Sequence, residues 1–388
     1  MKKSLLAFAA LPGAFALSAH AQSSVTLYGV IDTGLAYASN QGGHGSWQQV
    51  SASTENTVFG LRGSEDLGGG LHAVFKLENG FNANSGSLYN AGDAFGEQAY
   101  AGLQDNTYGT LLIGRQFDTF NDMMGPLAAA GGSYGGSLAA HPFDNDNLAA
   151  DSMSVNDVVK YTSNAYDGVS FEGMYAFGNK AGNFADNRAW GFSAAYSNGP
   201  VNLAAGYLEL GGPGGGADDA NPDGAVARDD GSADFVAQRQ RIWGAGGNYT
   251  FGKATVGLLW THSQIGDMAD VYAGGLGYAG LGGNLRLDNY ELNARYALTP
   301  ALSIAGAYTF TDGAYGDGAA SASPDWNQFT LQTDYTFSKR TDVYLEGVYQ
   351  HVHGGPADSV LDDAMINTLS PSSTQTQVAV EIGLRHQF

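Results

Sequence analysis

The chain has 388 residues, with 57 Gly, 14% charged residues, a formal net charge of −21 and no cysteine. Its aromatic content of 12% is too high for a disordered chain, and the excess of acidic residues argues against a nucleic-acid binder. The lack of cysteine excludes disulfide scaffolds and thiolate metal sites.

The first 21 residues have the pattern of a secretory signal peptide. Lys2 and Lys3 form a basic start, an apolar stretch covers residues 5–17, and residues 19–21 (Ala-His-Ala) form a cleavage pattern. The apolar stretch is too short for a membrane helix. We therefore expect an exported protein that begins at Gln22, whose net charge of −21 becomes −23 when both lysines are removed.

From residue 22 onward, apolar and polar residues alternate in one segment after another. In the last segment, Val378, Val380 and Ile382 share one parity, whereas Ala379 and Glu381 share the other. Side chains alternate across a strand, so each segment has one apolar face and one polar face. In chain order the sequence predicts sixteen strands, at residues 24–38, 57–66, 71–81, 97–104, 110–116, 156–163, 169–178, 188–196, 201–209, 238–249, 253–262, 285–298, 302–310, 326–337, 342–350 and 377–388.

The connections between these strands alternate in length. The short ones, such as 66–70 and 299–301, are rich in the Asp, Asn, Gly, Ser and Pro of tight turns. The long ones are about 39–56, 82–96, 117–155, 179–187, 210–237, 263–284, 311–325 and 351–376. Short turns at one end and long loops at the other are typical of outer-membrane barrels. Residues 22–388 are therefore predicted to form an all-β, 16-stranded antiparallel transmembrane β-barrel.

The charges follow the two faces of the predicted strands. The apolar faces carry almost none, with Arg241 and Asp342 as exceptions near strand ends. This suits a membrane, because Arg or Lys at the lipid midplane costs roughly 2–4 kcal/mol. The polar faces carry both signs, at Asp32, Arg62, Lys76, Glu78, Lys160, Glu172, Glu291, Arg295, Asp334, Glu346, Glu381 and Arg385. Such a lumen is expected to be a water-filled channel.

Several motifs resemble one known family over the whole mature chain. They are SVTLYGVID at 24–32, FGLRGSEDLG at 59–68, GRQ at 114–116, VKYT at 159–162 and GLRHQF at 383–388. The chain resembles the trimeric general-diffusion porins of Gram-negative bacteria, in their β-proteobacterial form. It departs from that family at Glu97, where the family usually has Arg.

The resemblance implies a homotrimer in the outer membrane, in contact with lipid and lipopolysaccharide, through which ions and small hydrophilic solutes diffuse. It also implies that the third external loop, 117–155, folds inward and that basic wall residues face it across the pore. Such a field would orient polar solutes and sort ions. The residues implied at this constriction are Arg62, Lys76, Arg115 and Lys160 on the wall and Asp118, Asp122, Asp144, Asp146 and Asp151 in the loop. Each of them could instead form an ordinary ion pair that pins the loop.

Two further roles come with the resemblance. Loop 82–96 would latch onto a neighbouring subunit, and Phe388 would act as an assembly signal on the last strand. For ion selectivity the sequence gives conflicting indications, because the net charge favours cations whereas lumen basic residues favour anions. We expect a weak cation preference.

An acidic loop offers the strongest metal pattern in the chain. Asp219, Asn221, Asp223 and Asp230 have the spacing of an EF-hand loop, but Pro222 and the absence of flanking helical patterns argue against one. An ordinary acidic external loop is the favoured interpretation, with a loosely bound divalent cation as the alternative. No other cofactor is expected.

The alternative function is an adhesin or a hydrolase on a barrel scaffold. A hydrolase needs a nucleophile beside a positioned His. The mature histidines lie in predicted loops or near strand ends, and none sits in a triad pattern. We therefore expect a channel and no enzyme.

Overall fold

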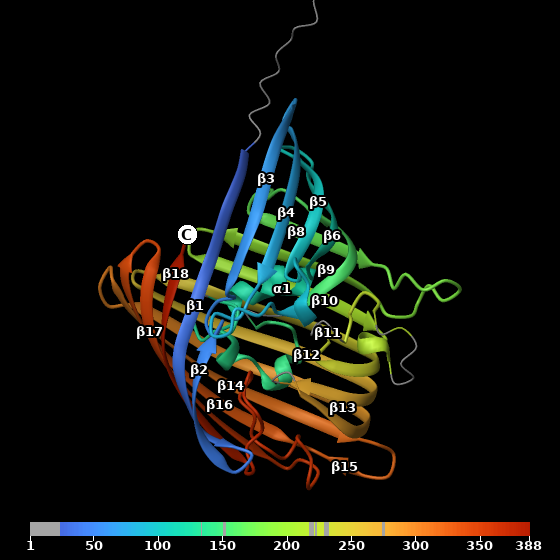
Figure 1. Ribbon diagram of the computed structural model, residues 1–388, viewed down its shortest axis with the longest axis vertical. Coiled ribbons are helices and arrows are strands. Elements are labelled where there is room, and N and C mark those ends of the chain that lie inside the picture. Colours follow the sequence, from blue (N-terminus) through green and yellow to red (C-terminus); the bar gives the residue numbers. More distant parts are fainter. Residues whose placement is uncertain are drawn as a thin grey trace, which may run out of the picture.

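The computed structural model describes residues 24–132, 134–149, 153–216, 221, 223–228, 233–273 and 276–388. These residues form one antiparallel sheet that closes on itself, because β1 pairs with β18 (Figure 1). The strands are β1 (Ser24–Gln41), β2 (His44–Ser51), β3 (Val58–Gly68), β4 (Leu71–Gly80), β5 (Gln98–Asp105), β6 (Gly109–Phe117), β7 (Ser154–Thr162), β8 (Val169–Ala176), β9 (Arg188–Asn198), β10 (Val201–Gly211), β11 (Phe235–Phe251), β12 (Ala254–Ala273), β13 (Leu276–Ala297), β14 (Leu302–Gly316), β15 (Ser321–Ala322), β16 (Asp325–Ser338), β17 (Thr341–His353) and β18 (Thr376–Gln387).

The 18 segments form the sixteen wall strands of the predicted barrel. β2 pairs with the second half of β1 and β3 with its first half, so these two segments act as one wall strand. The two-residue β15 likewise continues β16 along β14. At the seam, the backbone groups of Gly29 and Phe388 exchange hydrogen bonds of 3.1 and 2.9 Å.

Two predicted loops prove to be largely strand. Residues 39–56 continue β1 to Gln41 and return as β2, and residues 263–284 are mostly the outer halves of β12 and β13. Backbone N–H and C=O groups outside the membrane still gain from pairing with a neighbouring strand. The pairing register shifts between Ala38 and Gln41 and between Ile265 and Met268, however, so the alternation is interrupted where these extensions begin.

The two faces of the wall differ as the alternation predicts. Leu27, Leu258 and Ile382 are 61, 65 and 58% exposed, whereas Gln328 and Glu346 on the opposite parity are buried. A continuous exposed apolar band of this kind matches the lipid-facing side of a membrane barrel.

Asp342 corrects one assignment made from the sequence. Strand β17 presents Val343 and Leu345 outward, so Asp342 lies on the polar face with Tyr344. There its carboxylate accepts a hydrogen bond of 3.1 Å from Arg385. Asp342 is therefore no exception on the apolar face, because it shares its parity with Glu346, which the alternation assigns to the polar face.

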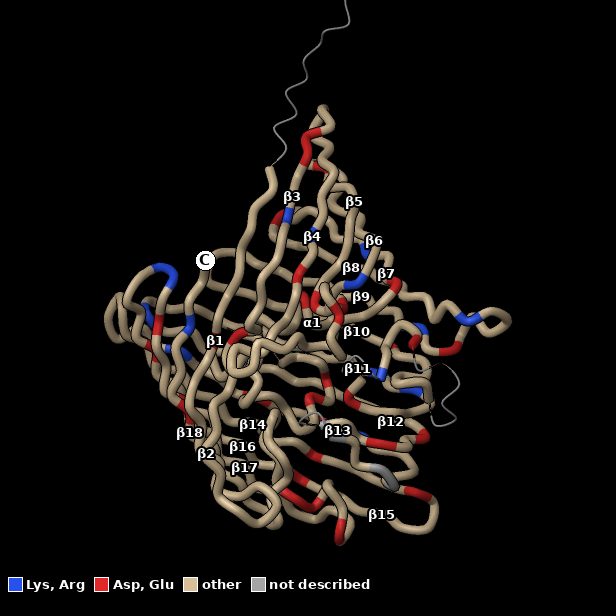
Figure 2. The backbone as a smooth tube through the Cα atoms, in the orientation of Figure 1, with Lys and Arg blue, Asp and Glu red and all other residues tan. Residues whose placement is uncertain are grey.

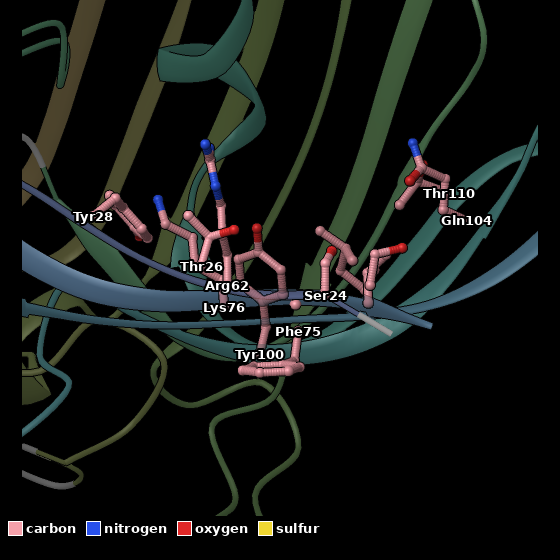
Figure 3. Close-up of a pocket in the computed structure, with 13 residues that line it drawn as sticks. Ser24, Thr26, Tyr28, Arg62, Phe75, Lys76, Tyr100, Gln104 and Thr110 are labelled. Carbon is pink, nitrogen blue, oxygen red and sulfur yellow. The ribbon is translucent and has the colours of Figure 1, made fainter. Parts of the chain in front are cut away.

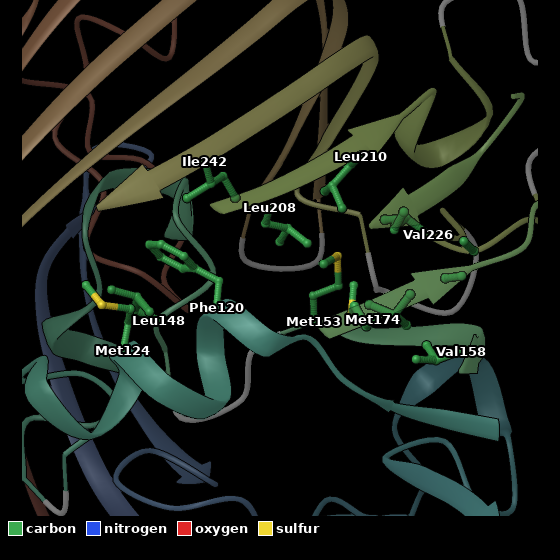
Figure 4. Packing of buried hydrophobic residues seen from close by; sticks show 14 of the residues in the cluster. Phe120, Met124, Leu148, Met153, Val158, Met174, Leu208, Leu210, Val226 and Ile242 are labelled. Carbon is green, nitrogen blue, oxygen red and sulfur yellow. The ribbon is translucent and has the colours of Figure 1, made fainter. Parts of the chain in front are cut away.

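Helical structure is confined to the connections. It comprises α1 (Thr119–Met124) and the short turns η1 (Asn90–Gly92), η2 (Gly125–Leu127), η3 (Ser137–Ala139), η4 (Pro142–Asp144) and η5 (Pro213–Gly215). In the part of the chain that the structure describes, no helix is both long and apolar enough to cross a membrane. The main apolar core lies between α1 and strands β8–β12 (Figure 4).

Candidate channel constriction

The long connection after β6 starts with a bulge and a capped helix. Gly114 has φ +131°, and a Cβ there would lie 2.2 Å from the Ala99 carbonyl oxygen. The pairing register shifts at this point, as in a β-bulge. Asp118 then caps α1, accepting hydrogen bonds from the N–H groups of Phe120 and Asn121 at 2.7 and 2.9 Å. Burial nevertheless raises the pKa of Asp118 to about 7.

The apolar side of α1 fixes the helix to the wall. Phe120 and Met124 are fully buried and belong to one cluster with Leu208 of β10 and Ile242 of β11 (Figure 4). Complete burial of such a side chain is worth about 1.5–3 kcal/mol. This packing holds the first turn of the connection against β10 and β11.

Beyond α1, amide and hydroxyl side chains of the wall bind the backbone of residues 125–149. These side chains have the polar parity of β11, β12, β13 and β16, so the segment lies against the polar face of the wall. The bonds run from Gln240 (3.0 Å) and Ser263 (2.7 Å) to the Asn145 carbonyl, from Asn293 to that of Leu127 (2.9 Å), and from Gln328 to those of Ala139 (3.1 Å) and Ala140 (3.0 Å).

A buried histidine, His141, joins this segment to a carboxylate of the wall. The ring nitrogens of His141 lie 2.7 Å from Asp146 Oδ2 and 3.1 Å from Glu291 Oε2. Glu291 Oε1 also accepts the N–H of Ala129 at 2.9 Å. Burial opposes a charged imidazole, but the two carboxylates outweigh it and raise the pKa of His141 to about 10. The imidazolium is therefore held between two anions.

A cavity of about 490 Å³ separates this segment from the opposite wall. Asn121, Asp122 and Pro126 line it on one side, and Glu55 and Arg385 line it on the other. Arg385 pairs with Asp342 at 3.1 Å and with Glu55 at 3.4 Å, and Asp122 pairs with Lys160. The connection and the wall thus face each other across water with both signs of charge.

Two other cavities extend the polar space in opposite directions. One of about 590 Å³ lies among the long connections, and its described lining includes Glu97, Asp144 and Asp234 but no Lys or Arg. The other, of about 450 Å³, lies towards the short turns and is lined by Arg62 and Lys76. The charged ends of Arg62 and Lys76 lie on the same side of the strands (Figure 3).

The predicted constriction residues separate into three groups. Asp122 lines the central cavity with its partner Lys160 beside it, and Arg62 and Lys76 line the cavity near the short turns. Arg115, Asp118, Asp144 and Asp146 are buried in structural contacts. Asp151 lies outside the described residues.

Arg115 illustrates the buried group. Its guanidinium donates to the Gly96 carbonyl and to Asn156 Oδ1. Asp144 accepts the N–H groups of Leu148 and Ala149 at 3.0 Å each. Because these polar groups are committed to neighbouring loop and strand atoms, they stabilise the conformation of the connection.

Sequence reasoning did not single out Glu55 or a buried acidic group near the seam. The Tyr344 hydroxyl lies 2.7 Å from Asp32 and 2.8 Å from Glu381, and Glu381 stands directly opposite Glu346 in the sheet. Both oxygens of Glu346 are buried without a hydrogen-bond partner among the described atoms. These acids are distant in sequence, so their proximity follows from the strand pairing and not from the sequence pattern.

The acidic loop gives no described metal site. Asp219 and Asp230 lie outside the described residues, and the Asn221 amide donates to the carbonyls of Gly178 and Asp186 at 2.7 and 3.3 Å. Over the described ranges, no group of three His, Asp or Glu side chains is placed to hold a metal ion.

Comparisons with known proteins agree with this architecture. The family model described as Gram-negative porin matches residues 6–355. An outer membrane porin protein of Bordetella pertussis is 30% identical, with 100% of both chains covered. The solved structure of an anion-selective porin from Comamonas acidovorans matches with a TM-score of 0.71 and 22% identity, over 94% of this chain and 100% of that chain. The trimer form of the Vibrio cholerae outer membrane protein OmpT matches with a TM-score of 0.63 and 16% identity, over 94 and 99% of the two chains. The chain therefore belongs to the Gram-negative porins and forms an outer-membrane channel for passive diffusion.

Proposed function

We propose that the channel is weakly cation-selective and that its narrow part lies between residues 118–149 and the opposite side of the barrel, where Glu55 precedes β3 and Arg385 lies on β18. The observation that carries this proposal is the cavity of about 490 Å³ lined by both elements. The side chain of Glu55 is 39% exposed and that of Asp122 is 29% exposed, whereas that of Arg385 is 13% exposed. The negative charges are therefore more accessible to ions than the positive one.

The surrounding charges support the same sign. Arg385 is shared between Asp342 and Glu55, and Lys160 is neutralised by Asp122. The cavity among the long connections has acidic residues but no Lys or Arg in its described lining. Arg62 and Lys76 lie beyond it and would moderate the preference. The anion selectivity of the Comamonas relative is a property of that protein and does not transfer at 22% identity.

Planar-bilayer recording in asymmetric KCl tests this proposal. The wild-type protein should show a reversal potential of the cation-selective sign. Glu55→Gln combined with Asp122→Asn should lower the ratio of K⁺ to Cl⁻ permeability by about twofold, the size expected for screened charges in water. Glu65→Gln, at an exposed site outside the cavity lining, is the matched control. An unchanged ratio in the double variant would contradict the proposed constriction.

We also propose a homotrimer in which loop 82–96 contacts a neighbouring subunit. The resemblance to trimeric porins supports it. Cross-linking of the detergent-extracted protein should give a trimer that is lost when the loop is replaced by a short Gly-Ser linker. A wild-type protein that stays monomeric would refute the assembly.

Phe388 is proposed to be an assembly signal. Its backbone closes the seam with Gly29, and its ring covers that glycine, where a Cβ would lie 2.3 Å from the ring. Phe388→Tyr should retain assembly, whereas deletion of Phe388 should reduce the heat-modifiable protein in the outer membrane. Equal assembly of the deletion variant would leave Phe388 with only its packing role.

The fold and the family point to a channel rather than to an enzyme. Of the histidines weighed for a hydrolase, His141 is held between two carboxylates and His262 is stacked on Trp243 with its Nδ1 2.7 Å from Asp288. Among the described residues, neither histidine ring has a Ser, Thr or Tyr hydroxyl as a hydrogen-bond partner. Assay of the purified protein against ester and peptide substrates should give no turnover, and His141-dependent hydrolysis would overturn this proposal.

A further inference from the structure

The cavity of about 590 Å³ among the long connections differs from the other two cavities in the side chains that line it. It is here named the outer vestibule, and its described lining comes from residues 48–56, 82–97 and 367–368 together with Asp144 and Asp234. Seven of its sixteen described lining residues are Asn or Gln, and three are Ser or Thr. The cavity near the short turns has one carboxamide, Gln104, and the central cavity has two. Uncharged groups that both donate and accept hydrogen bonds are therefore concentrated at the outer end of the channel.

Part of this hydrogen-bonding capacity is not used within the protein. The side chains of Asn367 and Thr368 form no hydrogen bond with the rest of the described chain. Asn90 also lines the vestibule, and its Oδ1 is buried without a hydrogen-bond partner among the described atoms. Donors and acceptors that the fold leaves unpaired in a cavity are available to a solute.

Backbone strain is concentrated around the same cavity. Of the 13 described non-glycine residues with positive φ, four line the vestibule, namely Ala52 (65°), Asn90 (52°), Asp144 (45°) and Thr368 (69°). A left-handed backbone is especially unfavourable for a β-branched residue such as Thr368. Strained residues of this kind cluster at binding sites, because the surrounding structure holds them in one arrangement that suits the ligand.

The charges around the vestibule disfavour an anionic solute. The connections 39–56, 82–97 and 351–376 contain no Lys or Arg, and Figure 2 shows Asp and Glu but no Lys or Arg around β15 at this end of the barrel. Two of the lining acids already have partners in the protein. Asp144 accepts the N–H groups of Leu148 and Ala149, and the Asn56 amide donates to Glu97 at 3.2 Å. The carboxamides and hydroxyls are therefore the groups best placed to select a solute, and uncharged hydroxyl groups match them.

We propose that the outer vestibule binds an uncharged polyhydroxylated solute, of the size of a disaccharide, before the solute enters the channel. The cavity volume lies within the range of about 300–1,000 Å³ that is typical of small-molecule sites. Each sugar hydroxyl both donates and accepts hydrogen bonds, as a carboxamide does. Ser53 lines the vestibule and the next residue, Thr54, lines the central cavity, so a bound solute would stand in the path of the ions. The site is independent of the sign of ion selectivity.

Block of the ion current by a sugar tests the proposal. In planar bilayers that hold the detergent-purified protein, sucrose added on the long-loop side should reduce the current in a saturable way. Polyethylene glycol of equal mass should reduce it only in proportion to its concentration. Asn367→Ala with Thr368→Gly removes an amide and a hydroxyl and relieves the left-handed strain at residue 368. The apparent dissociation constant for sucrose should then rise by about fivefold or more, since each neutral hydrogen bond contributes about two- to tenfold. The control Asn198→Ala with Thr107→Gly removes the same groups at exposed short turns and should keep the wild-type constant.

Three results would overturn the inference. Sucrose and polyethylene glycol could act alike, which would make the block a matter of excluded volume. The vestibule variant and its control could have equal constants for sucrose, which would place the binding elsewhere. A disaccharide of two glucosamine units could block at a concentration more than about tenfold lower than sucrose, which would make the vestibule an ammonium site selected by its acids. Both substituted vestibule residues lie in the connection 351–376, apart from loop 82–96, so the test is separate from that of subunit assembly. If the double variant fails to fold, Asn367→Ala alone gives the same test.

Discussion

The two halves of the inner wall use their polar residues in different ways. Along β11–β16, amide, hydroxyl and carboxylate side chains bind the connection 118–149 and are almost completely buried. Along β3 and β4, Arg62 and Lys76 line a water-filled cavity that the connection does not cover. A polar residue on the inner face is thus structural or solute-facing according to which half carries it. The parity pattern alone cannot distinguish the two.

The largest effect is expected in the covered half of the inner wall, namely strands β11–β16, which bind the connection 118–149. Removing Glu291, which anchors the connection there, tests the comparison most strongly. Glu291→Ala would leave the His141 imidazolium and the Ala129 N–H without their partner inside the wall. Removing one member of a buried ion pair costs about 3–5 kcal/mol. We expect the free energy of unfolding to fall by that amount, measured by denaturant or thermal unfolding of the folded barrel. Glu65→Ala, at an exposed position, is the control and should unfold as the wild type does. Equal stability of the two variants would show that the attachment does not depend on this carboxylate.

A pH titration sharpens the same comparison with a smaller effect. The folded-state pKa of His141, about 10, lies above its ordinary value of 6.5. Its stabilisation is therefore complete below pH 6.5 and is lost as the pH rises through 10. The unfolding free energy of the wild type should fall across that window by more than that of His141→Gln, which cannot titrate there. Parallel pH profiles for the two proteins would argue against a protonated His141 in the attachment.

The sequence predicted the barrel far better than it predicted the constriction. Alternation located all sixteen wall strands, because a face of Leu27, Leu258 and Ile382 beside a polar face leaves a period of two wherever lipid covers the wall. It missed the outer halves of β12 and β13, since the register shifts on both sides of Met268 and the period of two is broken there. For sites, the sequence could name inner-face residues but not their partners.

Arg115 shows why partners were out of reach. The bulge at Gly114 shifts the register beside it, and the side chain bonds to Gly96 and Asn156 in a buried position. Glu55 was missed for the opposite reason. It lies in an irregular stretch between β2 and β3, where its backbone N–H donates to Asp32 at 2.8 Å and no periodicity marks it. Both positions depend on contacts between segments distant in sequence.

The smallest effect is expected on β3 and β4, the open half of the inner wall that the connection does not cover. It concerns ion selectivity and leaves stability unchanged. Arg62→Ala with Lys76→Ala should raise the ratio of K⁺ to Cl⁻ permeability by about two- to threefold, because two screened positive charges leave the water-filled wall. Stability should be retained, since Glu78 keeps its hydrogen bonds to Tyr28 at 2.7 Å and Gln98 at 3.0 Å after Lys76 is lost. Lys339→Ala with Arg340→Ala removes the same charge at an exposed turn and should leave the reversal potential in asymmetric KCl unchanged. If the first pair lowered stability without changing selectivity, the open half would be as structural as the covered half, and the distinction between them would fail.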